Sequence, residues 1–213
     1  MPKHCGIDAK AVRVSGLPII FLIGGPGAGK RTQCAKLAER YDFLCIISTD
    51  LLRHEVSTRS ERGFVVARLM AEGRLVPPEL LLELIKEKML STLSTTSGYI
   101  LSGFPRGKEQ CKLFDKQVRP PDLVIYLSVS YSLLMDRIMA KTVTTTERQF
   151  SHFDPCGRRI SDFQHLSKAV VKYYKKKLVI IDGEKEVPGV FEDICVAIDV
   201  VAKNSPANHA STS

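Results

Sequence analysis

The sequence predicts an α/β protein with three layers, in which helices cover both faces of a five-stranded parallel sheet. The first observation behind this prediction is a set of short apolar runs without alternation, as expected for strands covered on both faces. The second is that the segments between these runs have helical patterns and are long enough for right-handed crossover connections. The chain has 213 residues, which suits one such domain, with or without a small inserted lid. The five predicted strands are residues 18–23, 45–48, 99–102, 122–128 and 178–182.

The first strand continues directly into a glycine-rich loop, residues 24–32, which reads Gly-Gly-Pro-Gly-Ala-Gly-Lys-Arg-Thr. Glycines allow successive backbone N–H groups to converge on phosphate oxygens, and the helix that follows directs its positive end toward them. Lys30 supplies a positive charge for the β- and γ-phosphates, and the Thr32 hydroxyl is the candidate ligand for a phosphate oxygen or Mg²⁺. Arg31 departs from the usual pattern, in which Ser or Thr follows the lysine directly. A glycine-rich turn without a ligand is the alternative, but it explains neither the number of glycines nor the lysine.

Two segments between strands differ in character. Residues 77–89 predict an amphipathic helix that begins at its prolines, with Leu82, Ile85 and Met89 on a stripe that faces the core. Residues 141–157 are polar and rich in turn-forming residues, and they predict a loop of the length that often serves as a lid. The ends of the chain, residues 1–15 and 204–213, are predicted to be flexible tails.

Composition and charge narrow the class of protein. The net charge of +8 fits an anionic ligand, either a nucleotide or a nucleic acid, and equally fits a solvated basic surface. Nucleic acid is disfavoured because the basic residues are distributed, with only Lys175–Lys177 forming a run. No apolar run approaches the length of about 20 residues that spans a membrane, and we expect neither membrane association nor a secretory signal.

The six cysteines lack paired spacing, which predicts free thiols in a reducing compartment and therefore a cytoplasmic protein. Cys156 and His152 lie four residues apart, but two ligands are too few for a structural zinc site.

Three further motifs follow the glycine-rich loop: Ser-Thr-Asp-Leu-Leu-Arg at 48–53, Gly-Arg-Leu-Val-Pro at 73–77 and Ser-Gly-Phe-Pro-Arg at 102–106. Together with the loop, they resemble the short-lid adenylate kinase family over residues 16–203. The resemblance implies a P-loop kinase fold with an AMP-binding segment at about 48–77 and a lid at about 141–157. It implies transfer of the γ-phosphoryl group of Mg-ATP to AMP, with ATP and AMP as partners, by a monomeric enzyme.

The same resemblance assigns roles to individual residues. Phosphoryl transfer needs positioning and positive charge, and guanidinium groups offer planar, bidentate donors to phosphate. Arg53 and Arg106 would hold the AMP phosphate, and Arg148 and Arg159 would close over the transferred group. The expected catalytic residues are Lys30, Arg106, Arg148 and Arg159. The expected donor-binding residues are Gly25, Gly27, Ala28, Gly29, Lys30, Arg31 and Thr32, with Thr32 also on the Mg²⁺ that accompanies ATP. The expected acceptor-binding residues are Thr49, Arg53, Val76, Gly103, Arg106 and Gln110.

The sequence also departs from the family pattern inside the expected site. Arg31 replaces a glycine, a glycine is missing before Asp50, and Ser102 replaces the aspartate that orients Mg²⁺-bound water. Phe150 and Ser151 stand where the family has two lid aspartates. These changes predict a weakened metal site and a slow enzyme. The alternative is a pseudokinase that binds nucleotide or a protein partner without turnover.

Two further expectations follow from the motifs. If a carboxylate is needed near the metal, the candidates left are Asp50 and Asp122. Thr49 and Gln110 stand where the family reads adenine, and they predict a preference for AMP over UMP and CMP.

Overall fold

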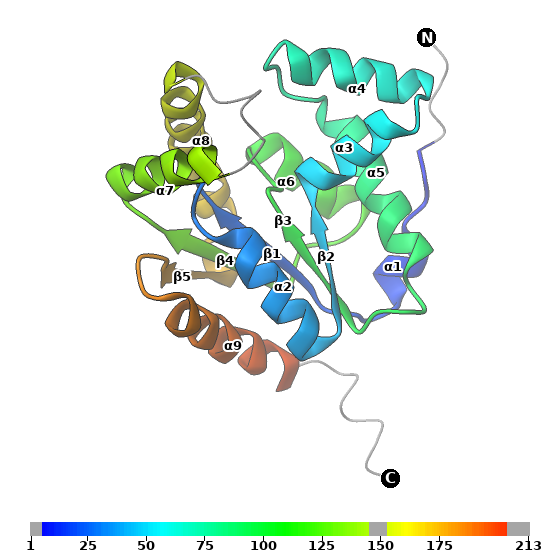
Figure 1. Cartoon of the computed structure of the whole chain (residues 1–213). Coiled ribbons are helices and arrows are strands. Elements are labelled where there is room, and N and C mark those ends of the chain that lie inside the picture. Colours follow the sequence, from blue (N-terminus) through cyan, green and yellow to red (C-terminus); the bar gives the residue numbers. More distant parts are fainter. Residues whose placement is uncertain (1–5, 145–152, 204–213) are drawn as a thin grey trace.

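Five parallel strands form one sheet, as predicted, and their order in the sheet is β2-β3-β1-β4-β5 (Figure 1). The computed structural model describes residues 6–144 and 153–203. Because every neighbouring pair of strands is parallel, the five carboxyl ends lie along one edge of the sheet. In open α/β sheets this is the edge at which ligands bind. The strands are β1 (Ile19–Gly24), β2 (Phe43–Ile47), β3 (Gly98–Ser102), β4 (Leu123–Ser128) and β5 (Leu178–Asp182).

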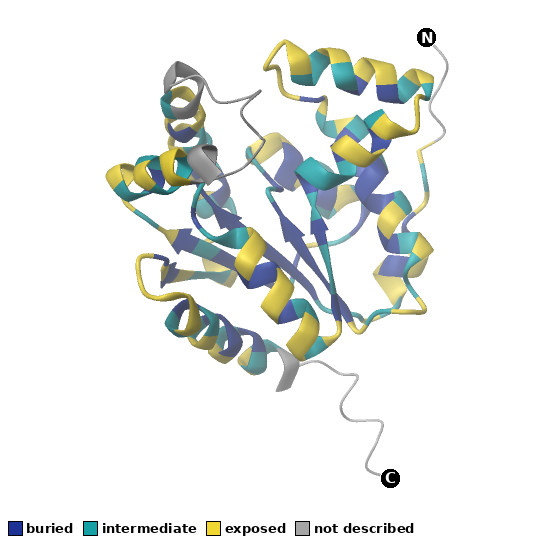
Figure 2. Cartoon of the chain, in the orientation of Figure 1, coloured by how far each residue is buried: buried dark blue, intermediate teal, exposed yellow. Residues whose placement is uncertain are grey.

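Helices pack on both faces of the sheet and create two separate cores. In β1, the side chains of Ile19, Phe21 and Ile23 enter one core, and those of Ile20 and Leu22 enter the other. Figure 2 shows the central strands buried along their length, with exposed residues on the outer sides of the helices. The described helices are α1 (Lys10–Val14), α2 (Lys30–Tyr41), α3 (Ser48–Ser57), α4 (Glu61–Ala71), α5 (Pro78–Ser91), α6 (Lys108–Gln117), α7 (Tyr131–Thr144), α8 (Phe153–Tyr173) and α9 (Val187–Lys203), with a 3₁₀ turn, η2, at Lys175–Lys177.

The two helical layers carry different parts of the chain. Helices α2 and α9 pack in the core that contains Ile20 and Leu22, whereas α1, α5 and α6 pack in the core that contains Phe21. The amphipathic helix predicted over 77–89 is confirmed as α5, and Leu82, Ile85 and Met89 are buried. In Figure 1, α3 and α4 stand on one side of the carboxyl edge of the sheet, and α7 with the start of α8 stands on the other.

The loop predicted over 141–157 is wrong at both ends. Residues 141–144 complete α7, and residues 153–157 form the beginning of α8. The polar composition of 153–157 indicated a turn, but Pro155 falls in the first turn of α8, where a proline costs little because the first N–H groups of a helix have no partner within it. Residues between these helices lie outside the described part of the chain.

The flexible tail predicted for residues 1–15 is also wrong, at residues 9–14. Ala9 and Val12 are buried in the core with α5, and the chain forms the short helix α1. Arg13 Nε donates to the carbonyl oxygen of Val118 at 2.8 Å, near the end of α6. The buried Lys86 of α5 donates from Nζ to the carbonyl oxygen of Ile7 at 2.9 Å. Residues 7–14 are therefore packed as part of the domain.

Two broader expectations are tested by the described residues. None of the helices described is long and apolar enough to cross a membrane. The cysteines whose side chains are described, which are Cys34, Cys45, Cys111 and Cys195, have free thiols, as predicted. His152 and the side chain of Cys156 fall outside the described residues.

Candidate active site

The loop between β1 and α2 has the backbone geometry that favours phosphate binding. Gly27 and Gly29 have φ angles of +83° and +84°, which residues with a side chain rarely adopt. A Cβ atom on Gly25 would lie 2.7 Å from Leu134 Cδ1, so a side chain here would require Leu134 of α7 to move. Gly29 begins α2 without a side-chain cap, as suits a helix whose first turn faces an anion.

Lys30 folds back along this loop. Its Nζ atom donates hydrogen bonds to the carbonyl oxygens of Gly24 and Gly25, at 2.7 and 2.8 Å. These two backbone contacts hold the ammonium group against the loop. A point charge held in this way suits the β- and γ-phosphates of a nucleotide in the loop.

A cleft of about 430 Å³ adjoins the loop and is lined by α2, α7, α9 and the segment after β5. Arg137 lines it and donates from Nη1 to the carbonyl oxygen of Gly183 at 3.0 Å. Gln33 donates from Nε2 to the carbonyl oxygen of Val187, while its Oε1 atom is buried with no hydrogen-bond partner among the described residues. A ligand with a hydrogen-bond donor would satisfy this oxygen atom. The cleft has the polar and apolar lining that a nucleoside needs beside its phosphates.

Sequence analysis missed several residues that line this cleft, namely Gln33, Gly183, Lys185 and Val187. A signal for three of them was available, because Gly183, Lys185 and Val187 follow the carboxyl end of a predicted strand. The general rule for parallel sheets directs attention to such segments.

Ser102 is the last residue of β3, at the carboxyl end of the strand next to β1, and is buried. The hydrogen bond with Cys45 and, to a smaller extent, the hydrogen bond with Ser102 lower the pKa of the Cys34 thiol. The positive charge of Lys30 acts in the same direction, against the opposing effect of burial. Ser102 therefore lies close to Cys34 of α2, at the position where the resembling family carries an aspartate.

The acceptor side of the site is built where β2 and β3 end next to each other. Ser48 donates from Oγ to the carbonyl oxygen of Gly103 at 3.1 Å. Gly103 has a φ angle of +76°, and a Cβ atom there would lie 2.6 Å from Ser48 Oγ, so only glycine fits. Thr49 lies in the first turn of α3, and Val76 has a buried side chain that belongs to the core.

Arg106 is positioned by two hydrogen bonds, one to its own motif and one to the helix that follows it, α6. Gln110 Oε1 accepts a hydrogen bond from the Arg106 backbone N–H at 2.7 Å, and Arg106 Nε donates to the carbonyl oxygen of Gly103 at 3.2 Å. Phe104 anchors the same motif in the core, with its ring centroid 5.9 Å from that of Phe21. This arrangement directs the amide nitrogen of Gln110, rather than its oxygen atom, to any base that it reads.

Two of the expected site arginines lie close enough to influence each other. Burial and, secondarily, the positive charge of Arg159 lower the pKa of the Arg106 guanidinium. Arg106 follows β3 and Arg159 belongs to α8, so the fold brings together residues that are far apart in sequence. Two neighbouring guanidinium groups repel each other unless an anion lies between them, which is the electrostatic property expected of a phosphate site.

Arg31, the unusual residue of the phosphate loop, forms an ion pair with the acceptor segment. Its Nη1 and Nη2 atoms donate to the two carboxylate oxygens of Asp50, at 2.7 and 2.6 Å. Arg53 Nη1 lies 3.8 Å from the same carboxylate. The hydrogen bonds with Arg31 are the main reason that the pKa of Asp50 lies below its usual value. The pair connects the helix of the phosphate loop to α3.

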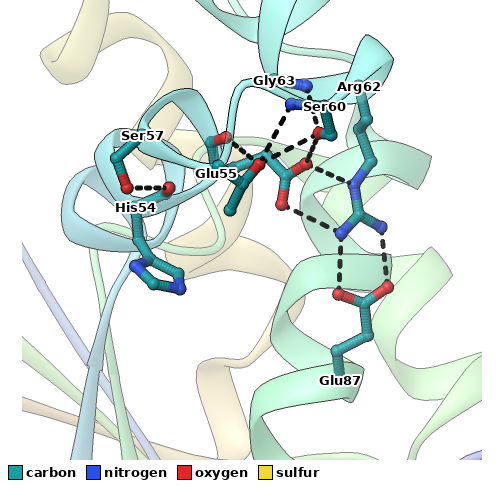
Figure 3. Close-up of polar contacts among 8 residues, drawn as sticks. His54, Glu55, Ser57, Ser60, Arg62, Gly63 and Glu87 are labelled. Carbon is teal, nitrogen blue, oxygen red and sulfur yellow. Dashed lines mark hydrogen bonds and ion pairs between the residues drawn. The ribbon is translucent and has the colours of Figure 1, made fainter.

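A second ion-pair network connects α3, α4 and α5 and stabilises the acceptor segment (Figure 3). Arg62 of α4 donates to both oxygens of Glu55 on α3, at 3.0 Å each, and to both oxygens of Glu87 on α5, at 2.7 and 2.9 Å. Ser60 caps α4 by accepting from the N–H of Gly63, and it donates to Glu55. The network fixes the angle between α3 and α4 and attaches both to the main domain.

The residues present fit a magnesium ion only if substrate phosphates supply most of its ligands. Thr32 is exposed and lines the cleft beside the loop. The described residues contain no group of three or more His, Cys, Asp or Glu side chains that could hold a metal ion. Mg²⁺ often keeps its waters and relies on substrate phosphates, which is compatible with this donor set.

Of the two alternative carboxylates, Asp122 is excluded by its position. It accepts a hydrogen bond from the N–H of Ile19 and forms an ion pair with Arg119, at the amino-terminal edge of the sheet. Asp50 lies on the correct side, and its carboxylate is bound to Arg31. Arg148, Phe150 and Ser151 fall outside the described residues.

Comparison with known proteins agrees with the resemblance to the adenylate kinase family. Residues 22–179 match the family model for adenylate kinase. The chain is 33% identical over 203 residues to adenylate kinase 1 of Drosophila melanogaster, covering 95% of this chain and 89% of that protein. It is 30% identical over 185 residues to adenylate kinase isoenzyme 1 of Homo sapiens, covering 86% of this chain and 95% of that protein. It is 36% identical over 185 residues to adenylate kinase isoenzyme 5 of Mus musculus, covering 86% of this chain and 33% of that longer protein.

Proposed function

Since this chain belongs to the adenylate kinase family, we propose that it transfers the γ-phosphoryl group of Mg-ATP to AMP, reversibly and at a low rate. In this proposal ATP occupies the phosphate loop and the cleft beside it, and AMP lies against α3 and the segment after β3. We further propose a cytoplasmic monomer that binds neither nucleic acid nor membrane.

The observation that carries the proposal is the proximity of Arg106 and Arg159 at the carboxyl edge of the sheet. Their mutual repulsion contributes to the lowered pKa of Arg106, and an entering phosphate would relieve it. Lys30 and Arg106 both follow strands that end on this edge, β1 and β3, which pair with each other. The donor and acceptor phosphates would therefore meet between the two groups, where positive charge stabilises the negative charge of the transition state.

The proposed roles of these residues require no covalent intermediate. Lys30 neutralises charge on the donor phosphates, Arg106 orients the acceptor phosphate, and Arg159, with Arg148, stabilises the group in transfer. Mg²⁺ bound with ATP would add charge neutralisation on the phosphates, with Thr32 as its protein ligand. We propose that this metal is held weakly, because Ser102 has neither the charge nor the two oxygens of a carboxylate.

We propose AMP as the preferred acceptor. The buried side chain of Gln110 presents its amide nitrogen, and Thr49 lies on the neighbouring element. A polar group built to bond one base edge disfavours other bases, since an unmatched buried donor costs about 1–3 kcal/mol.

A pseudokinase is the second candidate, and the ion pair between Arg31 and Asp50 favours it. This pair connects the two substrate regions before any substrate is bound. If it persisted, it would hold nucleotides without allowing the approach that transfer needs, and the protein would be a binding module.

A coupled assay for ADP, with ATP, AMP and Mg²⁺ supplied together or singly, distinguishes the two candidates. The enzyme proposal expects ADP only when both nucleotides are present, and it expects Lys30→Met to abolish most of the signal. ADP formation no faster than in Lys30→Met, in a protein that binds both nucleotides by calorimetry, would support the pseudokinase instead.

A further inference from the structure

The ion pair between Arg31 and Asp50 joins the phosphate loop to the acceptor segment. Binding of the donor nucleotide does not by itself explain why an arginine of the phosphate loop pairs with the acceptor segment. Arg31 directly follows Lys30 but turns toward α3, where both of its terminal nitrogens reach the carboxylate of Asp50. Arg53, an expected ligand of the acceptor phosphate, lies 3.8 Å from the same carboxylate. One anionic group therefore faces two guanidinium groups, one from each substrate region.

A phosphate group could reach the two arginines that now bind the Asp50 carboxylate. The side chains of Arg31, Asp50 and Arg53 are 60%, 42% and 54% exposed, so a soluble ligand can reach them. Arg31 already makes a bidentate contact with this carboxylate, and arginine binds phosphate in the same geometry. A phosphate monoester, however, carries a charge of about −1.5 to −2 at pH 7, whereas the carboxylate carries a single charge. An incoming phosphate therefore has an energetic advantage over the Asp50 carboxylate in competing for these arginines.

We propose that Arg31 is an additional acceptor-binding residue, and that the AMP phosphate displaces the Asp50 carboxylate from Arg31 and Arg53. This inference rests on the proposed function, because it takes AMP as the acceptor. Asp50 acts as an internal anion that keeps the two arginines oriented while the acceptor is absent. Once displaced, it leaves the AMP phosphate bound to a residue of the donor loop, which places acceptor and donor next to each other.

Calorimetric titration with AMP, without Mg²⁺ or ATP, tests this exchange through binding alone. Arg31→Gln should weaken AMP binding by about tenfold, the loss expected for a charge-assisted hydrogen bond. Arg31→Lys keeps the charge but not the planar pair of donors, so its affinity for AMP should lie between those of Arg31→Gln and the natural protein. Asp50→Asn should strengthen AMP binding by about two- to fivefold, because it removes a competing and repelling carboxylate.

Two controls make the result specific. Adenosine lacks the phosphate, so its binding should be the same in the natural protein, Arg31→Gln and Asp50→Asn. Arg68→Gln removes another exposed arginine that pairs with a carboxylate, that of Glu72 at 2.9 Å, and it should leave AMP binding unchanged. The melting temperatures of all variants confirm that each is folded.

The outcomes separate this inference from the proposed function. If the natural protein binds AMP but Asp50→Asn binds it more weakly, the pair persists in the complex and the exchange is refuted. Unchanged AMP affinity in Arg31→Gln also refutes it, with the proposed function left standing. If the natural protein does not bind AMP at all, the proposed function and this inference both fail.

Discussion

The network around Arg62 predicts that replacing this arginine destabilises the protein far more than removing its exposed partner, Glu87. Arg62→Met would leave Glu55, whose side chain is 7% exposed, with the Ser60 hydroxyl as its hydrogen-bond donor and a weaker contribution from the charge of His54. Breaking a fully buried ion pair costs about 3–5 kcal/mol. Because Arg62 itself is 31% exposed, we expect a smaller loss, about 2 kcal/mol, which corresponds to a melting temperature lower by about 4–8 °C.

The pH dependence of this loss has a defined sign. Hydrogen bonds with Arg62 hold the pKa of Glu55 below its usual value, against the effect of burial. The pair therefore stabilises the natural protein fully above the unfolded pKa of about 4.3, and this contribution is lost as the pH falls through the lower folded pKa. In Arg62→Met, burial without the arginine favours the protonated Glu55. The difference in melting temperature should be largest at neutral pH and should shrink as the pH approaches 4.

Glu87→Gln is the matched control. The side chain of Glu87 is 39% exposed, and its removal leaves Arg62 paired with Glu55. We expect a loss of about 0–1 kcal/mol, as for other exposed ion pairs. Thermal unfolding followed by circular dichroism between pH 4 and pH 7 measures both variants. Equal destabilisation by the two changes, or a deficit in Arg62→Met that does not vary with pH, would refute this account of the network.

Three further predictions concern the site. Ser102→Asp should raise Mg²⁺-dependent ADP formation by about tenfold or more, which is the usual effect of groups that orient metal ligands. If the natural protein is inactive and Ser102→Asp restores no activity, the cause lies instead at Arg31 or at the turn before Asp50. Nucleotide affinity without Mg²⁺ should stay equal or fall slightly in Ser102→Asp, as measured by calorimetry, because a carboxylate near phosphates repels them. AMP should bind more tightly than CMP to the natural protein, and Gln110→Ala should reduce that ratio; equal or tighter binding of CMP would contradict the role given to Gln110.

The strands and the phosphate loop could be predicted because their signals are local. A continuous apolar run is sufficient to indicate a buried parallel strand, and the glycines at 27 and 29 have backbone angles that the loop motif requires. The start of α8 was mistaken for a loop because polar residues and a proline are compatible with both a turn and a helix start. In that case the packing of the rest of α8, which local sequence does not reveal, decides the structure.

The contacts across the site could not be predicted in the same way. Arg31 and Asp50 are 19 positions apart, and their pairing depends on how β2 ends and how α3 begins. The proximity of Arg106 and Arg159 depends on the packing of α8 against the main domain. Resemblance to a family placed these residues in one site, but only the three-dimensional arrangement reveals which side chains are already paired.

The segment that precedes β1 has a practical consequence for anyone who shortens or tags this protein. The family resemblance begins at residue 16, so a protein trimmed there keeps every motif of the family. It would uncover the cavity filled by Val12 and would leave the buried ammonium group of Lys86 with Gln117 as its hydrogen-bond acceptor, without the carbonyl oxygen of Ile7. Such a truncated protein should be less soluble and less stable for reasons unrelated to catalysis. Fusion partners and truncations should therefore leave the chain from Gly6 onward intact.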